Sequence, residues 1–97
     1  MKQIKQLKKG YLKLIGDKRT NVWHISIYMA LLYLWAKNDG TNPITITRKQ
    51  VMKLAHVSSN ATYHKCIKQL QKFGYINYVP SYNYFLGSQV FLLSVTD

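Results

Sequence analysis

The stretch of residues 47–76 constrains the fold more than any other part of the chain. Thr47 and Gln50 have the spacing of a capping box, which predicts that a helix begins at Arg48. Apolar residues follow at helical spacing until residues 56–59 break the pattern and predict a tight turn. The stretch therefore predicts a short helix, a tight turn and a second helix.

The second helix is predicted to have one apolar and one basic face. Ser58 or Ser59 is expected to cap it, because a serine oxygen can accept from an amide left unpaired at a helix start. Gly74 suits the left-handed conformation that follows a helix. On a helical wheel the inward face comprises Tyr63, Cys66, Ile67 and Leu70. The outward face carries no acid and comprises Ala61, Lys65, Lys68 and Lys72, flanked by Thr62, His64 and Gln69.

A short helix, a tight turn and a longer helix with a basic outer face are typical of a helix-turn-helix. The run VSSNATYHKCIKQLQKFGYI resembles the recognition-helix stretch of bacterial winged helix-turn-helix regulators. With HISIYMALLYLWAKN and PSYNYFLGSQV, it is similar to short winged-helix proteins encoded on bacterial mobile elements such as conjugative transposons. The resemblance covers roughly residues 44–95 and implies a three-helix core plus a β-hairpin wing. It also implies a transcriptional regulator or accessory factor.

The remaining segments of the second half predict a small antiparallel sheet, which gives a mainly α fold of the α+β class. Residues 44–46 alternate as a short strand, and residues 75–79 and 89–95 are rich in β-branched and aromatic residues. Residues 80–88 would form the wing loop. No Lys or Arg follows Lys72, so a wing that inserts a cation into the minor groove is not expected.

The wing loop allows two interpretations. Its side chains could donate hydrogen bonds to phosphates, and the candidates for these wing contacts are Tyr82, Asn83 and Tyr84. Alternatively, the aromatic wing packs against a partner protein or a second subunit.

A helix predicted over residues 22–37, capped by Thr20 or Asn21, is apolar on two nearly opposite sides. Such a helix must be covered on both. One cover is the helix-turn-helix, and the other is either the N-terminal segment or a second subunit. Because many helix-turn-helix proteins are symmetric dimers, a homodimer is expected. The expected interface residues are Trp23, Ile27, Leu31 and Leu34.

Residues 1–19 are expected to form a basic N-terminal arm, and residues 20–97 the winged helix domain. The arm holds seven of the fourteen Lys and Arg residues. Its apolar spacing fits an amphipathic helix, but its glycines allow a short strand equally well. The arm either touches phosphates or a minor groove, or is a solvated lysine face.

The net charge of +11 favours polyanionic partners, namely nucleic acid or an anionic membrane. The most apolar run, residues 22–36, is shorter than the roughly 20 residues that cross a bilayer. No secretory signal is expected, so the protein is predicted to be cytoplasmic. Cys66, as a single inward-facing cysteine, is expected to be a reduced thiol.

The acidic and histidine residues argue against an enzyme and against a metal site or other cofactor. The chain has three aspartates and no glutamate, and they lie far apart in the sequence. His24, His56 and His64 fall in different predicted elements. His64 and Cys66 point to different sides of their helix, which prevents joint zinc ligation.

These observations predict sequence-specific binding of double-stranded DNA, with a recognition helix at about residues 59–72. Asn60 and His64 are the better candidates for base edges, and the lysines for phosphates. The alternatives are a protein-interaction module that has lost DNA readout, and a replication-initiation or single-strand-binding factor. The expected DNA-binding residues are Thr47, Arg48, Lys49, Ser58, Ser59, Asn60, Thr62, His64, Lys65, Lys68 and Lys72.

Overall fold

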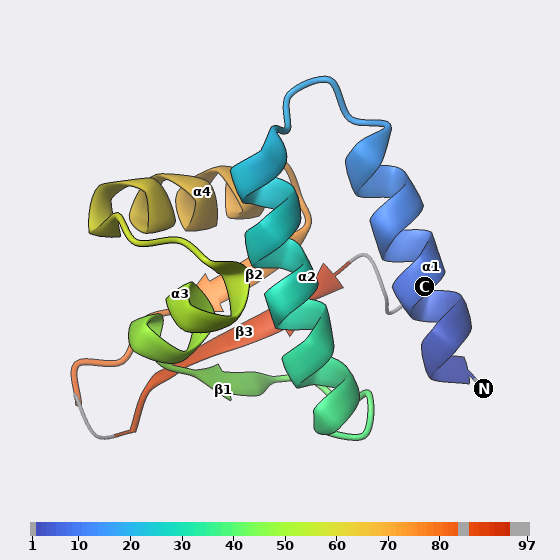
Figure 1. The fold of residues 1–97 in the computed structure, drawn as a ribbon. Coiled ribbons are helices and arrows are strands. Elements are labelled where there is room, and N and C mark those ends of the chain that lie inside the picture. The colour runs from blue at the N-terminus through green and yellow to red at the C-terminus, as the bar shows by residue number, and fades with distance from the viewer. Residues whose placement is uncertain (1, 84–85, 94–97) are drawn as a thin grey trace.

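The computed structural model describes residues 2–83 and 86–93, and the side chains of these residues apart from 2–4, 6 and 7. The described part is an α+β fold with four helices and three strands, as the sequence predicted for the fold class (Figure 1). The elements are α1 (Lys2–Ile15), α2 (Val22–Lys37), β1 (Ile44–Ile46), α3 (Arg48–Ala55), α4 (Asn60–Lys72), β2 (Ile76–Val79) and β3 (Ser88–Leu92).

The starts of three helices are fixed by side-chain caps. Of the two predicted caps of α2, Asn21 fills the role: its side chain accepts from the His24 amide, and the His24 ring accepts from the Asn21 amide at 2.9 Å. Thr47 accepts from the Gln50 amide at 3.2 Å, so the predicted start of α3 at Arg48 is confirmed. Each cap satisfies an amide that the first helical turn leaves unpaired.

The predicted short helix, tight turn and longer helix are confirmed. His56 ends α3 in the left-handed conformation with a φ of 57°, and Val57 is buried within the turn. Ser59, one of the two predicted caps, then accepts from the Thr62 amide at 3.2 Å and starts α4. Gly74, at a φ of 88°, turns the chain from α4 towards β2.

The sheet ties the N-terminal side of α3 to the C-terminal side of α4. Its strand order is β1-β3-β2 and both pairings are antiparallel, with Ile44 opposite Val90 and Ile76 opposite Leu92. The predicted short strand at residues 44–46 is therefore present and pairs with β3. The predicted wing strands are shorter than expected, and residues 94 and 95 of the second lie outside the described residues.

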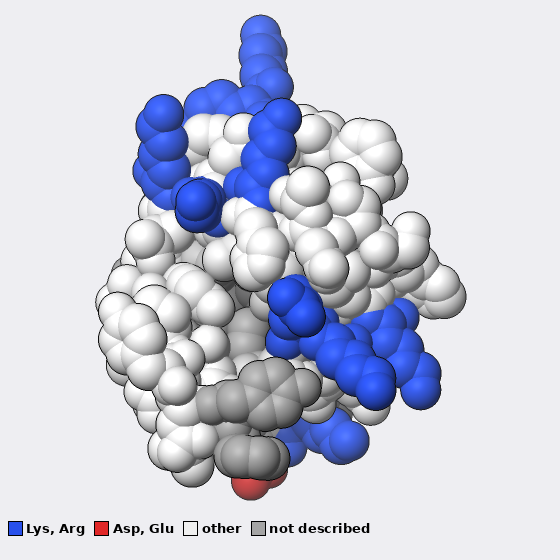
Figure 2. All heavy atoms as spheres, turned by 90° about the vertical axis from the view of Figure 1, so that its left-hand side faces the viewer, with Lys and Arg blue, Asp and Glu red and all other residues white. Residues whose placement is uncertain are grey.

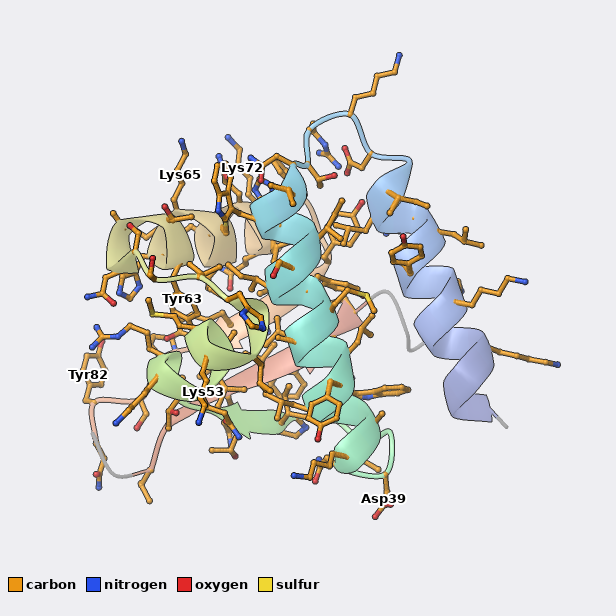
Figure 3. All side chains as sticks on the ribbon, viewed as in Figure 1. Asp39, Lys53, Tyr63, Lys65, Lys72 and Tyr82 are labelled. Atoms are coloured by element: carbon orange, nitrogen blue, oxygen red, sulfur yellow. The ribbon has the colours of Figure 1, made fainter. Side chains whose placement is uncertain are left out.

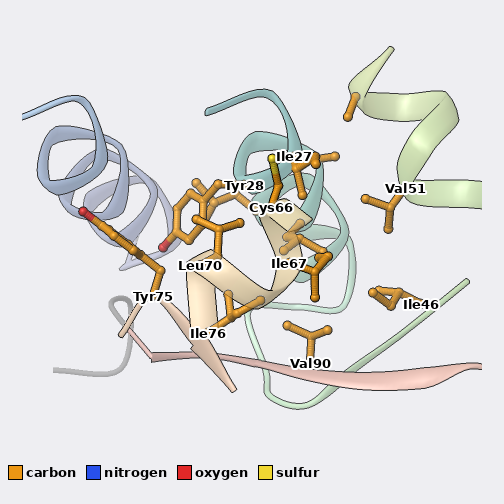
Figure 4. Close-up of a cluster of buried hydrophobic side chains, with 14 of the residues drawn as sticks. Ile27, Tyr28, Ile46, Val51, Cys66, Ile67, Leu70, Tyr75, Ile76 and Val90 are labelled. Atoms are coloured by element: carbon orange, nitrogen blue, oxygen red, sulfur yellow. The ribbon is translucent and has the colours of Figure 1, made fainter. Parts of the chain in front are cut away.

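Helix α2 lies at the centre of the fold. It packs against α3 and α4 on one side and against α1 on the other (Figure 1). The N-terminal segment is thus a helix rather than a strand, and it supplies the second cover that α2 requires. Leu14 of α1 is fully buried, so the predicted basic arm contributes to the core through α1. Figure 4 shows the apolar side chains of α2, α4 and the strands meeting in one cluster.

This arrangement corrects part of the expected dimer interface. Ile27 and Leu31 are both 0% exposed, so they have no surface to offer a second subunit. The physical reason is that residues of the same chain already cover both sides of α2. Trp23 is 51% exposed and Leu34 is half-buried.

Candidate nucleic-acid interface

Helix α4 has the two faces that the sequence predicted. Its apolar residues recur at spacings of three and four, which places them on one side of a helix. The buried side consists of Tyr63, Cys66, Ile67 and Leu70. The three lysines of α4 are exposed, and Lys65 and Lys72 point away from the core (Figure 3). Burial raises the pKa of the Cys66 thiol, as expected for an inward-facing reduced cysteine.

The start of α4 presents a polar surface. Ser58, Ser59 and Asn60 are exposed, while Thr62 is half-buried. Because the Ser59 oxygen already accepts from the Thr62 amide, part of its hydrogen-bonding capacity is occupied. Asn60 and His64 stand one turn apart on the exposed side, and the His64 ring packs edge-on against Tyr63 with ring centroids 5.3 Å apart.

A second set of cations lies on α3. Arg48 and Lys49 are exposed in its first turn, beside the Thr47 cap. Lys53, which the sequence-based list of DNA-binding residues omits, is exposed one turn further along. Its position four residues after Lys49 is a signal that could have placed it on the same side of the helix.

These cations form two groups on one face of the molecule. Figure 2 shows Lys and Arg side chains at the top of this face and again lower down, with uncharged surface between them. Lys65, Lys68 and Lys72 come from α4, which lies above α3 in Figure 1. Among the described acids, Asp17 is paired with Arg19, and Asp39 follows the end of α2 that lies farther from α4 (Figure 3).

The predicted wing contacts are only partly described. Tyr82, in the loop between β2 and β3, is 102% exposed. Asn83 donates its amide to the Ser81 hydroxyl at 3.1 Å, which shapes the turn. Tyr84 lies outside the described residues.

The loop between α1 and α2 carries a network that sequence reasoning missed. Arg19 donates through Nε and Nη2 to both carboxylate oxygens of Asp17, at 2.9 and 2.7 Å. The Tyr75 hydroxyl donates to the same carboxylate at 2.8 Å, and the Arg19 guanidinium lies 4.3 Å from the centre of the Phe73 ring. No periodicity connects residues 17–19 with residues 73–75, so sequence spacing could not reveal this contact.

Charge and burial set the protonation of this network. The hydrogen bonds from Arg19 hold the pKa of Asp17 well below its usual range. Burial, reinforced by the bond to Asp17, raises the pKa of Tyr75 to about 12. Both groups therefore keep one charge state across the neutral range.

A buried pair joins the start of α2 to α4. His24 is 1% exposed, and its Nε2 lies 2.6 Å from the Gln69 Oε1. Because the His24 Nδ1 accepts from the Asn21 amide, Nε2 carries the proton and donates to Gln69. Gln69, expected at the border of the exposed face, is thus engaged with the interior.

An open apolar groove lies between α2 and α3. It has a volume of about 270 Å³ and is lined by Ser26, Met29, Ala30, Tyr33 and Leu54. The Ser26 hydroxyl donates to the Ala55 carbonyl and ties the two helices together at the groove. Tyr33 is 53% exposed there.

Within the described residues, no group of three or more His, Cys, Asp or Glu side chains is placed to hold a metal ion. No helix in this part of the chain has the length and apolar character needed to cross a membrane. Comparisons of the chain with models of protein families, with curated proteins and with solved structures gave no match.

Proposed function

We propose that this chain is a winged helix-turn-helix protein that binds double-stranded DNA, with α4 lying in the major groove. The observation that carries the proposal is the separation of α4 into a buried apolar side and an exposed side without acids. A major groove about 12 Å wide admits one α-helix. A helix whose buried side packs on the core and whose exposed side is polar suits the major groove.

The two groups of cations, one along α4 and one at the start of α3, support this orientation. Lys65, Lys68 and Lys72 would reach phosphates along one edge of the groove, and Arg48 and Lys49 would reach phosphates on the other. Lys65 and Lys72 are seven residues apart, which at 1.5 Å per residue is about 10 Å along the helix. Asn60 and His64 would meet base edges between the two rows.

The hairpin formed by β2 and β3 would serve as the wing. Tyr82 in the loop of the hairpin is exposed and could donate to a phosphate or sugar. The resemblance to regulators of mobile elements supports a role as a transcriptional regulator or accessory factor in the bacterial cytoplasm.

The proposal is tested by measuring the affinity for fluorescent duplex DNA as a function of salt. Several phosphate contacts predict a steep linear fall of log affinity with log salt, by about 0.9 per contact. Duplex should bind more tightly than a single strand of the same sequence. No duplex binding at low salt would contradict the proposal, and tighter binding of the single strand would favour a replication or single-strand role.

Protein interaction is a second candidate, favoured by the groove between α2 and α3. Exposed apolar surface of this kind often marks a contact with another protein. If this is the main role, duplex affinity would be weak and nearly independent of salt. Tyr33→Ser and Leu54→Gln test whether the groove takes part in DNA binding, because neither change should alter duplex binding by more than about twofold if α4 is the DNA-binding element.

A further inference from the structure

Arg19 is held in one orientation by contacts on two sides of its guanidinium. One edge is engaged by both oxygens of Asp17, and one face lies over the Phe73 ring. Asp17 is itself anchored by the Tyr75 hydroxyl, and its side chain is only 11% exposed. A long, flexible side chain has therefore already lost much of its rotamer freedom in the free protein.

The rest of the guanidinium faces outwards. The Arg19 side chain is 56% exposed, and its N–H groups beyond those bound to Asp17 have no hydrogen-bond partner within the described part of the chain. A guanidinium has five donors in a fixed fork, so donors remain for a second anion. Asp17 thus orients Arg19 without using all of its donors.

The position of Arg19 connects it with the lysines of α4. Phe73 directly follows Lys72, so the contact between Arg19 and Phe73 places the α1–α2 loop at the C-terminal end of α4. Lys18 is exposed beside Arg19 in this loop. The loop is fixed further by the Thr20 hydroxyl, which bonds the carbonyls of Leu14 and Asp17 at 2.9 and 2.8 Å.

We infer that Arg19, with Lys18 and Lys72, forms a preorganised phosphate-binding site at the C-terminal end of α4. Its ligand is a backbone phosphate of the duplex, next to the stretch that α4 contacts. This inference rests on the proposed function. Arginine suits the role because two of its parallel N–H groups match two phosphate oxygens, and because orienting it in advance reduces the entropy lost on binding.

The alternative is that Arg19 only fastens α1 to the rest of the fold. If Arg19 only fastens α1, substituting it would lower the free energy of unfolding but would leave the DNA contacts unchanged. The two roles are separated by a pair of changes that keep the net charge, Asp17→Asn with Arg19→Gln. The amide oxygen introduced by Asp17→Asn can still accept from Tyr75, and the loss of one negative and one positive charge leaves the total at +11.

The expected result is that Asp17→Asn/Arg19→Gln weakens duplex binding about tenfold and lowers the salt slope by about 0.9. The matched control, Lys8→Gln with Asp39→Asn, also removes one positive and one negative charge. It should bind duplex DNA within about twofold of the wild type. Both substituted control positions are exposed; Lys8 belongs to α1, and Asp39 follows the C-terminal end of α2. Equal binding by wild type and Asp17→Asn/Arg19→Gln would overturn the inference while leaving the proposed function intact.

Phosphate-ethylation interference with the wild-type protein gives a readout that does not depend on how well a variant folds. It should reveal an interfering phosphate beyond the base pairs protected by α4. Absence of that phosphate would also overturn the inference. Failure of the wild type to bind any duplex at low salt would instead reject the proposed function, and the inference with it.

Discussion

Two tyrosines show how single side chains hold this small fold together. Tyr75 is fully buried, yet its hydroxyl reaches Asp17 and the Lys13 carbonyl at the end of α1. Tyr63 is 2% exposed and packs within the core face of α4. A buried tyrosine adds a large apolar area while its hydroxyl bonds a polar partner, as Tyr75 does here.

These two tyrosines should ionise at a higher pH than an ordinary tyrosine, and their ionisation should destabilise the fold. Burial raises the pKa of both Tyr63 and Tyr75 to about 12, above the ordinary value of 10.0. The folded state therefore holds these protons more tightly, so their stabilisation is complete below pH 10 and is lost as the pH rises towards about 12. Ultraviolet titration of tyrosinate should show a late phase, and Tyr75→Phe should reduce its amplitude. A single phase near the ordinary pKa in folded protein would contradict this account.

The buried His24 should contribute measurably to stability. His24→Ala removes a side chain that accepts from the Asn21 amide and donates to Gln69, which leaves both groups without these partners. We expect the free energy of unfolding in urea to fall by about 2 kcal/mol. His64→Ala, at an exposed position on α4, is the control and should change it by less than about 0.5 kcal/mol. Equal effects of the two substitutions would show that the His24 contacts contribute little.

At the scale of the elements, sequence spacing predicted the features of the helices that depend on residues close together in the chain. The start of α3, the alternatives for the caps of α2 and α4, and the inward face of α4 all follow from spacings within a few residues. Local spacing could not predict which element covers the second side of α2. The residues around Ile27 are equally apolar whether α1 or a second subunit packs on them. The Arg19 contact with Phe73 likewise joins segments more than fifty residues apart, and only the folded chain brings them together.

The exposed lysines of α4 should contribute to duplex binding without selecting a sequence. Lys65→Ala with Lys68→Ala should weaken binding to every duplex tested and reduce the salt slope by about two, because each phosphate contact contributes about 0.9. Lys5→Ala with Lys8→Ala removes the same charge from exposed positions on α1 and is the control. Similar losses for the two variants would mean that net charge, rather than the face of α4, governs binding.

The described part of the molecule combines a packed apolar core with an uneven distribution of charge. Helix α2 contacts α1, α3, α4 and β3, so α3 and α4 are both packed against a central helix. The sheet links the start of α3, through β1 and β3, to the end of α4 through β2. Such support keeps the two cation groups in a fixed relation, which the proposed binding of both edges of a groove requires.

Amide chemical-shift mapping by NMR during titration with duplex DNA tests the central proposal most directly. The account predicts that the largest changes lie at residues 58–68, with further changes at residues 47–49 at the start of α3 and at residues 18 and 19. The groove between α2 and α3 should change little. Changes concentrated around Met29, Tyr33 and Leu54, with α4 unaffected, would contradict the proposal that α4 is the DNA-binding element.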